Sequence, residues 1–200
     1  MKETRTNLDI YHDIIESLAA ALDAKDVYTS GHSTRVGNMA YELAINLRLD
    51  DYNLQMIHIA GHLHDVGKIG VPDNILNKRD KLNDYEWGIM KSHPEIGYNI
   101  LEKADSLKEI SHIVLHHHER WDGAGYPKWL SNEDVPLGSR IIAVCDSIDA
   151  MRSNRPYRKI ISNAECYNEI LKNKAIMYDP KITDCIVENW SNIVIPYYSE

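Results

Sequence analysis

The amino-acid sequence predicts an all-α fold. Apolar residues recur at three- and four-residue steps along most of the chain, which is the spacing of helices with one buried face. Alternating patterns that would indicate strands are scarce, and the best of them is Ile193-Val194-Ile195 near the end. No internal repeat or low-complexity tract is found. A chain of 200 residues with these features is expected to fold as one helical domain around a single core.

The first predicted helix covers residues 7–23. Its expected buried face consists of Ile10, Ile14, Leu18, Ala21 and Leu22. Three roles are open for this segment: it packs on its own domain, connects to a preceding domain, or pairs two chains through the Ile10, Ile14 and Leu18 face. Residues 1–23 are therefore set apart as an N-terminal helix, and residues 24–200 form the domain proper.

Two longer helices follow. The second is marked by Val36, Met39, Ala40, Leu43 and Leu47, and the third by Leu54, Ile57, Ala60, Gly61 and His64. Shorter helices are predicted at about 84–91, 94–103, 107–117, 137–151, 162–173 and 180–191. A capping box of Ser162 with Glu165 starts one of them, and Asp179-Pro180 starts the last.

Polar, turn-rich residues fill the stretches 70–83 and 119–136, which are expected to be loops. Loops of that length inside a compact domain tend to be functional. Gly67 is expected to end the third helix, which would leave the side chain of Asp65 free to extend away from the helix.

Composition and charge narrow the class of protein. No run approaches the roughly 18 apolar residues of a membrane span, and the N-terminus lacks an apolar signal core, so a cytoplasmic location is expected. Cys145, Cys166 and Cys185 are widely spaced and form no C-x-x-C pair, which is typical of reduced core cysteines. The net charge of −8 argues against binding to DNA or RNA polymers, so an anionic ligand would need local positive charge.

Histidines and acids gather in a pattern suited to metal ions. Ten histidines occur, six of them in the clusters His58, His62, His64 and His116, His117, His118. His64-Asp65 offers an imidazole nitrogen and a carboxylate at a helix end. The two oxygens of Asp65 are able to bridge two metals about 3.5 to 4 Å apart, the spacing used in phosphate-ester hydrolysis.

The second cluster and one isolated acid support the same interpretation. Adjacent helical residues such as His117 and His118 point about 100° apart, so both serve one site only at a helix end or around two metals. Asp146 stands among apolar neighbours, where an unpaired carboxylate is costly to bury. Any one of these residues alone is better explained as a packed or surface side chain, but their combination favours a metal site.

Two long runs resemble the paired signatures of the HD-GYP domain, a branch of the HD metal-dependent phosphohydrolases. They are His64-Asp65-Val66-Gly67-Lys68-Ile69-Gly70-Val71-Pro72-Asp73 and His117-His118-Glu119-Arg120-Trp121-Asp122-Gly123-Ala124-Gly125-Tyr126-Pro127. The resemblance continues through residues 28–36, 91–94, 143–146 and 155–158, from about residue 19 to about residue 180.

This resemblance implies an HD-domain helical bundle that hydrolyses cyclic di-GMP to linear pGpG, and in some members to GMP, with a metal-bridging hydroxide. Carried over to this sequence, the metal ligands are His32, His64, Asp65, His93, His117, His118 and Asp146, with Asp65 bridging. The resemblance implies iron or manganese as the metals, and the mixed imidazole and carboxylate set allows either, with no soft thiolate to favour zinc. Some members hold a third metal through a glutamate four residues before the first histidine, where this chain has Tyr28, so two metals are expected.

The family also implies substrate contacts. Lys68 would place its ammonium on a nonbridging or leaving phosphate oxygen, and Arg155 and Arg158 would contact phosphate and guanine. Tyr126 either stacks on the substrate or rigidifies its turn. Two further acids, Glu119 and Asp122, either orient the histidine ligands or shape their loop.

Alternative functions keep part of this interpretation. The same chemistry would serve a mixed cyclic GMP-AMP dinucleotide or another nucleotide phosphate, because nothing in the sequence distinguishes one purine edge from another. A non-catalytic module that binds a nucleotide or a partner protein is less favoured, since none of the seven ligand positions has been lost. Members of the family usually carry a sensory or receiver domain, for which the 200 residues leave little room.

Overall fold

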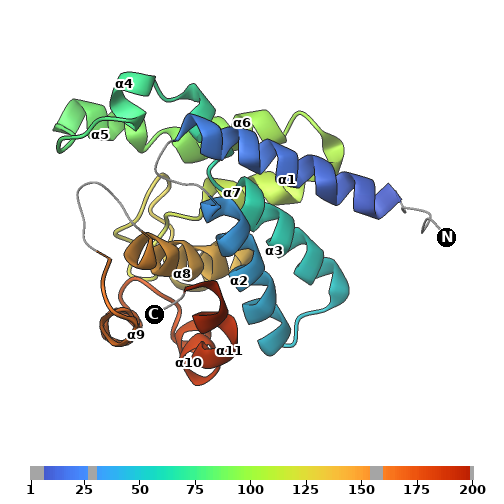
Figure 1. Ribbon diagram of the computed structural model, residues 1–200, viewed down its shortest axis with the longest axis vertical. Helices are drawn as coiled ribbons and strands as arrows, with labels where there is room; N and C mark the ends of the chain where they lie inside the picture. Colours follow the sequence, from blue (N-terminus) through green and yellow to red (C-terminus); the bar gives the residue numbers. More distant parts are fainter. Residues whose placement is uncertain (1–6, 27–30, 154–159, 199–200) are drawn as a thin grey trace.

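The computed structural model describes residues 7–26, 31–153 and 160–198, with the side chains of residues 7–12 and 23 left aside. In these ranges the chain is helical and forms no strand beyond an isolated bridge between Lys174 and Tyr178 (Figure 1). The predicted all-α class is therefore confirmed.

The helices alternate with short 3₁₀ turns. The α-helices are α1 (Asn7–Lys25), α2 (His32–Asn46), α3 (Asp51–Leu63), α4 (Asp73–Leu76), α5 (Asp84–Met90), α6 (His93–Leu101), α7 (Lys108–Leu115), α8 (Leu137–Arg152), α9 (Asn163–Lys172), α10 (Pro180–Glu188) and α11 (Trp190–Ile193). The 3₁₀ helices are η1 (Val66–Gly70), η2 (Asp105–Leu107), η3 (Asn132–Asp134) and η4 (Ile195–Tyr197).

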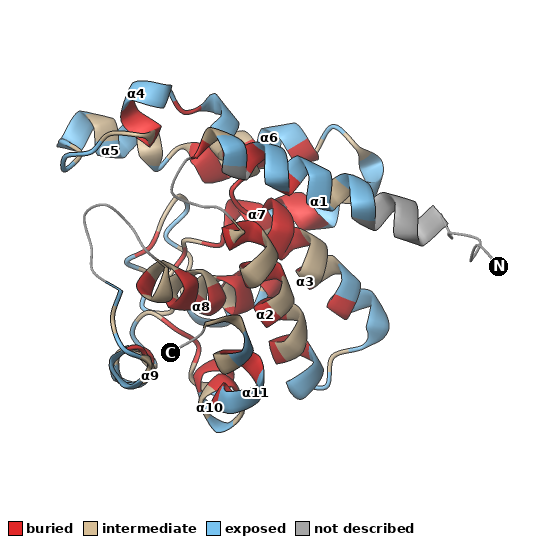
Figure 2. Ribbon diagram, viewed as in Figure 1, coloured by how far each residue is buried: buried red, intermediate tan, exposed pale blue. Residues whose placement is uncertain are grey.

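Helices α2, α3 and α8 form the centre of the molecule. α2 packs against both α3 and α8, and α7 packs against α3 and α8. α1 crosses one end of this group, α9 to α11 cover the other, and α4 with α5 projects from the side (Figure 1). Buried residues concentrate where these helices face one another (Figure 2). The main core includes Val36, Met39, Leu43, Ile141 and Ile148, which are fully buried.

The buried face of α1 differs from the predicted one. Ile14 and Leu18 are 50% and 54% exposed, whereas Ala19 and Leu22 are buried. The helix packs against α2, α3 and η1, and Ala19 and Leu22 are on the side that faces them. Of the predicted buried face, Leu22 is confirmed, Ile14, Leu18 and Ala21 are wrong, and the side chain of Ile10 lies outside the described part of the chain.

The end of the chain and the stretch 70–83 are partly helical. The apolar run Ile193-Val194-Ile195, the best strand pattern in the sequence, forms no strand, in agreement with the all-α prediction, because Ile193 ends α11 and Ile195 begins η4. A short apolar run does not distinguish a strand from a buried helical turn. The stretch 70–83, expected to be a loop, contains α4, whose Ile75 and Leu76 pack with Val71 in a small core of their own.

The predicted caps and cysteine states are confirmed. Ser162 and Glu165 form the capping box that begins α9, and Asp179 accepts a hydrogen bond from the Lys181 backbone at the start of α10. The three cysteines are free, two buried and one partly buried. Among the described residues, no helix is long and apolar enough to cross a membrane.

Candidate metal centre

Helix ends supply most of the side chains at this centre. His32 begins α2, His93 begins α6, and His64 and Asp65 directly follow α3. His117 and His118 lie in the turn after α7 and not on the helix itself, which lets both side chains face one site. The seventh residue, Asp146, projects from the middle of α8. The structure thus brings together all seven side chains singled out in the sequence.

One group of three consists of His32, His64 and Asp65, all buried, with their ligand atoms within 4.8 Å of one another. The Nε2 atoms of His32 and His64 are 3.2 Å apart. Asp146 belongs to the same group, because its Oδ1 lies 3.4 Å from the Nε2 of His32.

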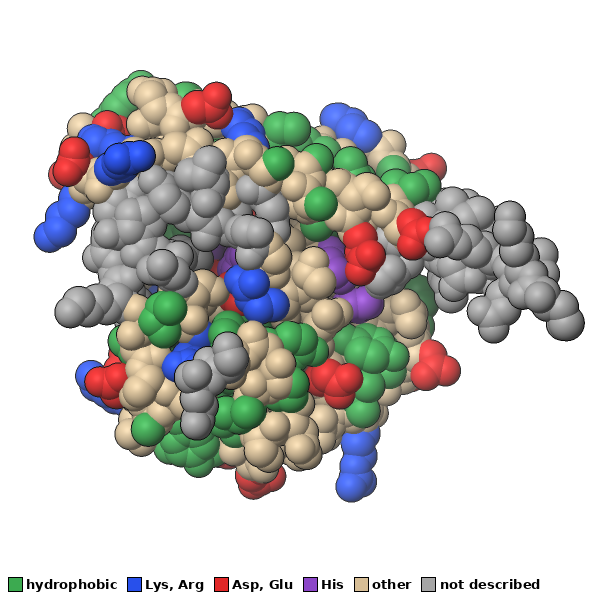
Figure 3. Space-filling view, in the orientation of Figure 1, with side chains coloured by type: hydrophobic (Ala, Val, Ile, Leu, Met, Phe, Trp, Pro, Cys, Tyr) green, Lys and Arg blue, Asp and Glu red, His purple; other side chains and the backbone are tan. Residues whose placement is uncertain are grey.

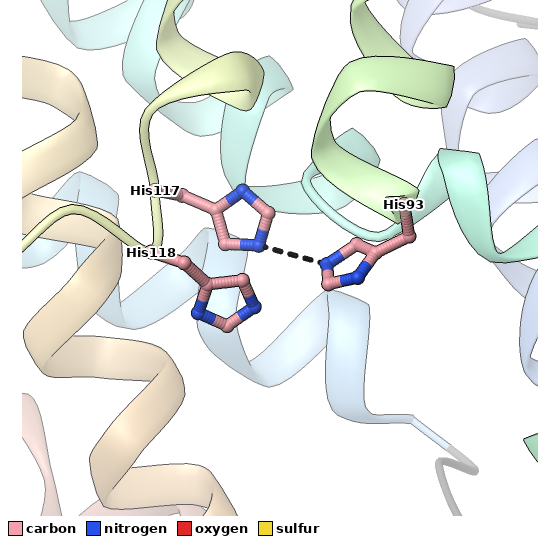
Figure 4. Close-up of side chains that lie close together, drawn as sticks. All are labelled: His93, His117 and His118. Carbon is pink, nitrogen blue, oxygen red and sulfur yellow. Dashed lines mark hydrogen bonds between the residues drawn. The ribbon is translucent and has the colours of Figure 1, made fainter. Parts of the chain in front are cut away.

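A second group consists of His93, His117 and His118. Figure 4 shows the His93 ring directed toward the other two rings, with its Nε2 3.3 Å from the Nε2 of His117. The His118 ring centre lies 5.0 Å from that of His93 and 4.0 Å from that of His117.

Asp65 lies between the two groups and presents one oxygen to each. Its Oδ2 is 3.4 Å from the Nε2 of His64 and 3.6 Å from that of His32. Its Oδ1 is 3.3 Å from the Nε2 of His93. A carboxylate arranged in this way has the geometry of a bridge between two neighbouring cations.

Hydrogen bonds fix which nitrogen of each ring faces the centre. The Nδ1 atoms of His64, His93 and His117 donate to the carbonyl oxygens of Gly61, Met90 and Val114, at 2.7, 2.8 and 2.6 Å. Because a carbonyl only accepts, each Nδ1 carries a proton, and in the neutral ring the Nε2 offers a bare lone pair.

These lone pairs fit cations. The Nε2 atoms of His93 and His117 face one another at 3.3 Å with no proton to join them. Burial, the largest cause, lowers the pKa of both rings and of His118, with neighbouring histidines adding to the effect for His117 and His118. Protonation is therefore opposed, and the lone pairs remain available to a divalent ion.

The group around His32 favours positive charge. Burial alone would lower the pKa of His32, but its hydrogen bond to Asp149 and the nearby Asp65 and Asp146 raise it to about 9. Burial alone would likewise raise the pKa of Asp65, yet Lys68 and the surrounding histidines hold it well below its usual value. A cation bound here would replace the proton on His32.

Asp149 is a site residue that the sequence analysis missed. Its buried carboxylate accepts from the Nδ1 of His32 at 2.6 Å, and also from Arg35, Ser153 and Tyr198. The same reasoning that singled out Asp146 applies to it, because it is another acid on the apolar helix α8. Asp149 therefore orients His32 as the carbonyl oxygens orient the other rings.

Lys68 lies at the edge of the centre. Its Nζ is 2.7 Å from Asp65 Oδ2 and 3.2 Å from Asp26 Oδ2. Burial alone would lower the pKa of Lys68, but the two carboxylates raise it above its usual value. The ammonium therefore stays charged beside the bridging carboxylate.

Gly67 does not end α3, contrary to expectation. The helix ends at Leu63, and Gly67 lies inside η1. A Cβ on Gly67 would lie 1.8 Å from the His93 carbonyl oxygen and 2.5 Å from the Gly97 nitrogen. Glycine is needed here because η1, which follows Asp65, packs directly on the first turn of α6.

The loop after α7 is held by its own residues. Asp122 pairs with Arg120 and accepts from the Ala124 nitrogen at 3.0 Å. Glu119 accepts from the Lys128 nitrogen at 2.6 Å and lies 3.6 Å from His116, which is not among the seven. Of the two roles considered for these acids, the geometry favours shaping the loop.

Tyr126 stacks on His118, with ring centres 4.8 Å apart and planes inclined by 29°. This contact fixes the His118 ring and leaves Tyr126 beside the centre. Three other residues singled out in the sequence, Tyr28, Arg155 and Arg158, lie outside the described residues.

Comparisons with known proteins agree with this geometry. The family model described as HD domain matches residues 16–182. The chain is 36% identical to a cyclic di-GMP phosphodiesterase of Thermotoga maritima, over 96% of this chain and 53% of that protein. It is 34% identical to 3′3′-cGAMP-specific phosphodiesterase 2 of Vibrio cholerae, over 91% of this chain and 35% of that protein.

A solved structure shares the fold. The crystal structure of V-cGAP3, a cyclic GMP-AMP specific phosphodiesterase of V. cholerae, superposes with a TM-score of 0.71 at 18% identity, covering 90% of this chain and 48% of that one. The chain spans roughly a third to a half of the length of the curated relatives described above.

Proposed function

The chain belongs to the HD-domain family, and we propose that it is a metal-dependent phosphodiesterase that opens a cyclic dinucleotide, with cyclic di-GMP as the first candidate. The observation that carries this proposal is the pair of ligand groups that share Asp65. Two cations held side by side suit in-line displacement at phosphorus, because one side of the site serves the attacking oxygen and the other the leaving oxygen.

The proposed centre holds two divalent ions, iron or manganese. His32, His64 and Asp146 would hold one, His93, His117 and His118 the other, and Asp65 both. When bound, the ions supply a water activated near neutral pH and positive charge for the phosphate oxygens. Imidazoles and carboxylates without a thiolate suit these metals.

The chain's own residues prepare the reaction. Hydrolysis of cyclic di-GMP to pGpG adds water across one P–O3′ bond, with one proton passing to the leaving 3′ oxygen. Lys68, with its raised pKa, is better suited to hold a nonbridging phosphate oxygen as a cation than to give up its proton. It also keeps Asp65 ionised, as a bridging ligand must be.

Substrate contacts beyond the phosphate are proposed for Tyr126, Arg155 and Arg158. Tyr126 is partly buried beside His118 and offers an aromatic face or a hydroxyl near the centre. The two arginines belong to the basic segment 151–159, which supplies the positive charge that an anionic dinucleotide requires in a chain of net charge −8.

A mixed cyclic GMP-AMP dinucleotide is the second candidate substrate. The similarity to a 3′3′-cGAMP-specific phosphodiesterase supports it. A purely regulatory, non-catalytic role is disfavoured because the seven side chains are present and converge.

The test is a digestion assay. Protein prepared without oxygen and reconstituted with iron or manganese is incubated with cyclic di-GMP or 3′3′-cGAMP, and products are separated by chromatography. We expect linear dinucleotide, with or without mononucleotide, and at least a hundredfold slower turnover in His93→Ala. Fully loaded protein that leaves both substrates intact would refute the proposal.

We also propose that α1 pairs two copies of the chain. Ile14 and Leu18 lie one turn apart and leave 50% and 54% of their surface exposed. The simpler alternative, in which α1 only packs on its own domain, leaves both of these side chains exposed to solvent. A second copy of α1 would cover them, and a domain outside the 200 residues is the competing occupant.

A further inference from the structure

A cation and an aromatic ring of the α5 region lie next to the proposed metal centre. Lys91, the residue that follows α5, holds its Nζ 5.6 Å from the ring centre of Trp87 and 5.3 Å from that of Tyr126. Both distances are within the reach of a cation–π contact. Tyr126 in turn stacks on the proposed ligand His118. One ammonium group therefore connects an aromatic ring of α5 to a ring beside the centre.

Packing of the protein interior does not explain Trp87. Its side chain leaves 45% of its surface exposed. The small core under α5 is built from other apolar residues, namely Val71, Ile75, Leu76, Leu82, Ile89 and Met90. A capping box of Asn83 with Glu86 fixes the start of the same helix. Helix α5 is thus held in place without the indole, which remains accessible for stacking.

The charge of Lys91 is not balanced by a neighbouring acid. Charged side chains of both signs share the surface over α4 and α5 (Figure 3). Two nearby lysines are paired, since Lys78 Nζ lies 2.6 Å from Glu86 and Lys128 Nζ 2.7 Å from Glu95. Lys91 is exposed and makes no ion pair within the described part of the chain. In a chain of net charge −8, this local positive charge suits an anionic ligand.

A cyclic dinucleotide is larger than the metal centre. It contains two phosphates and two purine bases, and the metal ions act on one phosphate. The second nucleotide therefore has to lie on the protein surface beside the centre. Nucleotides bind to surfaces that combine a cation for the phosphate with an aromatic face for the base. Lys91 and Trp87 offer these two groups on the side of Tyr126.

We propose that Lys91 and Trp87 form the subsite for the second nucleotide of the substrate. Lys91 binds the phosphate that is not cleaved, and the base stacks on Trp87. The identity of this ligand rests on the proposed function, but neither residue takes part in bond cleavage. Because every base presents an aromatic face, stacking on Trp87 accepts guanine and adenine alike. The subsite thus selects a dinucleotide over a mononucleotide, and not one purine over the other.

The test compares the binding of a linear dinucleotide with that of a mononucleotide. Metal-loaded full chain is dialysed to equilibrium against GMP or against pGpG with a phosphorothioate linkage, which resists cleavage. The wild type is expected to bind the dinucleotide about tenfold more tightly than GMP. Trp87→Ala and Lys91→Gln should each weaken binding of the dinucleotide about fivefold or more, with a much smaller effect on GMP.

Three variants control for a general change of the surface. Tyr85→Ala removes another aromatic side chain of α5, which is 77% exposed, and Lys128→Gln removes the lysine that is paired with Glu95. Both should bind the dinucleotide as the wild type does. Trp87→Phe keeps an aromatic face and should retain most of the affinity that Trp87→Ala loses.

The inference is overturned if the wild type binds GMP as tightly as the dinucleotide. It also fails if either Trp87→Ala or Lys91→Gln binds the dinucleotide as the wild type does. Failure of the proposed function gives a different result. Loaded protein that binds the dinucleotide through Trp87 and Lys91, but leaves cyclic di-GMP and 3′3′-cGAMP intact, would refute the phosphodiesterase activity and support the subsite.

Discussion

At the scale of single residues, the centre depends on which nitrogen of each imidazole carries its proton. In three rings, those of His64, His93 and His117, Nδ1 donates a hydrogen bond to a backbone carbonyl three residues earlier. His32 begins its helix and uses Asp149 instead. Asp149 therefore orients a proposed metal ligand without being one itself.

Asp149→Asn tests this positioning role. The amide keeps the size of the side chain but removes the negative charge that makes His32 a stronger ligand, so affinity for the metal on its side should fall about 10- to 100-fold. Elemental analysis after dialysis is expected to show about one ion per chain instead of two. Tyr198→Phe, which removes one hydrogen bond to Asp149 but keeps its charge, is the control. Unchanged content in Asp149→Asn would contradict the role.

The metal-free protein should be most stable near pH 6.5. The pKa of His32 is raised from 6.5 to about 9 in the fold, so its contribution is complete below 6.5 and is lost as the pH rises through 9. That shift corresponds to about 3 kcal/mol. His93, His117 and His118 have lowered pKa values, so below pH 6.5 protons bind preferentially to the unfolded chain.

Chemical denaturation in a chelator at pH 5.5, 7 and 9 measures this dependence. The unfolding free energy is expected to fall on both sides of the maximum, and the alkaline loss should disappear in His32→Gln. A metal-free protein whose stability rises steadily from pH 7 to 9 would disagree with the charges assigned to the site.

At the scale of elements, the proposed ligands are positioned by helix ends whose backbones come into close contact. The approach of η1 to α6 sets Asp65 against His93, and Gly67 lies at the contact. Gly67→Ala should therefore destabilise the fold by roughly 3 kcal/mol, because backbone atoms have to move to admit the methyl group. It should also weaken metal binding.

Gly88 provides the matched control. It lies in α5, and a Cβ there would meet nothing within 4 Å. Gly88→Ala is expected to raise the unfolding free energy by about 0.5 to 1 kcal/mol. Urea denaturation of both variants makes the comparison, and equal effects would show that the contact at Gly67 is not tight.

The positions of the helices could be predicted from the sequence better than the way in which the helices pack against one another. The spacing of Val36, Met39 and Leu43 predicted α2, because a long helix repeats its pattern over several turns. The buried stripe of α1 escaped prediction, since it depends on contacts with α2 and α3. A three-residue apolar run at the end of the chain gave too little pattern to separate a helical turn from a strand.

The residues of the site also divide into those that a local pattern predicts and those that depend on contacts between distant parts of the chain. Residue types at a helix end predicted His64 and Asp65, whereas His32 and His93 were identified only through the resemblance to a family. Asp149 was not identified, although it is an acid on the same apolar helix as Asp146. Its role became visible only through its contact with His32, 117 positions away in the sequence.

At the scale of the whole molecule, the exposed edge of α1 gives a prediction about assembly. The wild type should sediment as a dimer at micromolar concentration, and Ile14→Asp with Leu18→Asp should give a monomer that keeps its metal content. Ile176→Asp, which changes an exposed isoleucine elsewhere, is the control and should leave the dimer intact. A wild-type monomer would rule out pairing through α1.

The fold as a whole brings two groups of proposed metal ligands to either side of Asp65, from five separate stretches of the chain. Anomalous diffraction at the iron or manganese edge, on crystals of loaded protein, tests this directly. The account predicts two peaks, one beside His32, His64 and Asp146 and one beside His93, His117 and His118, with Asp65 between them. A single peak, or two that do not share Asp65, would contradict it.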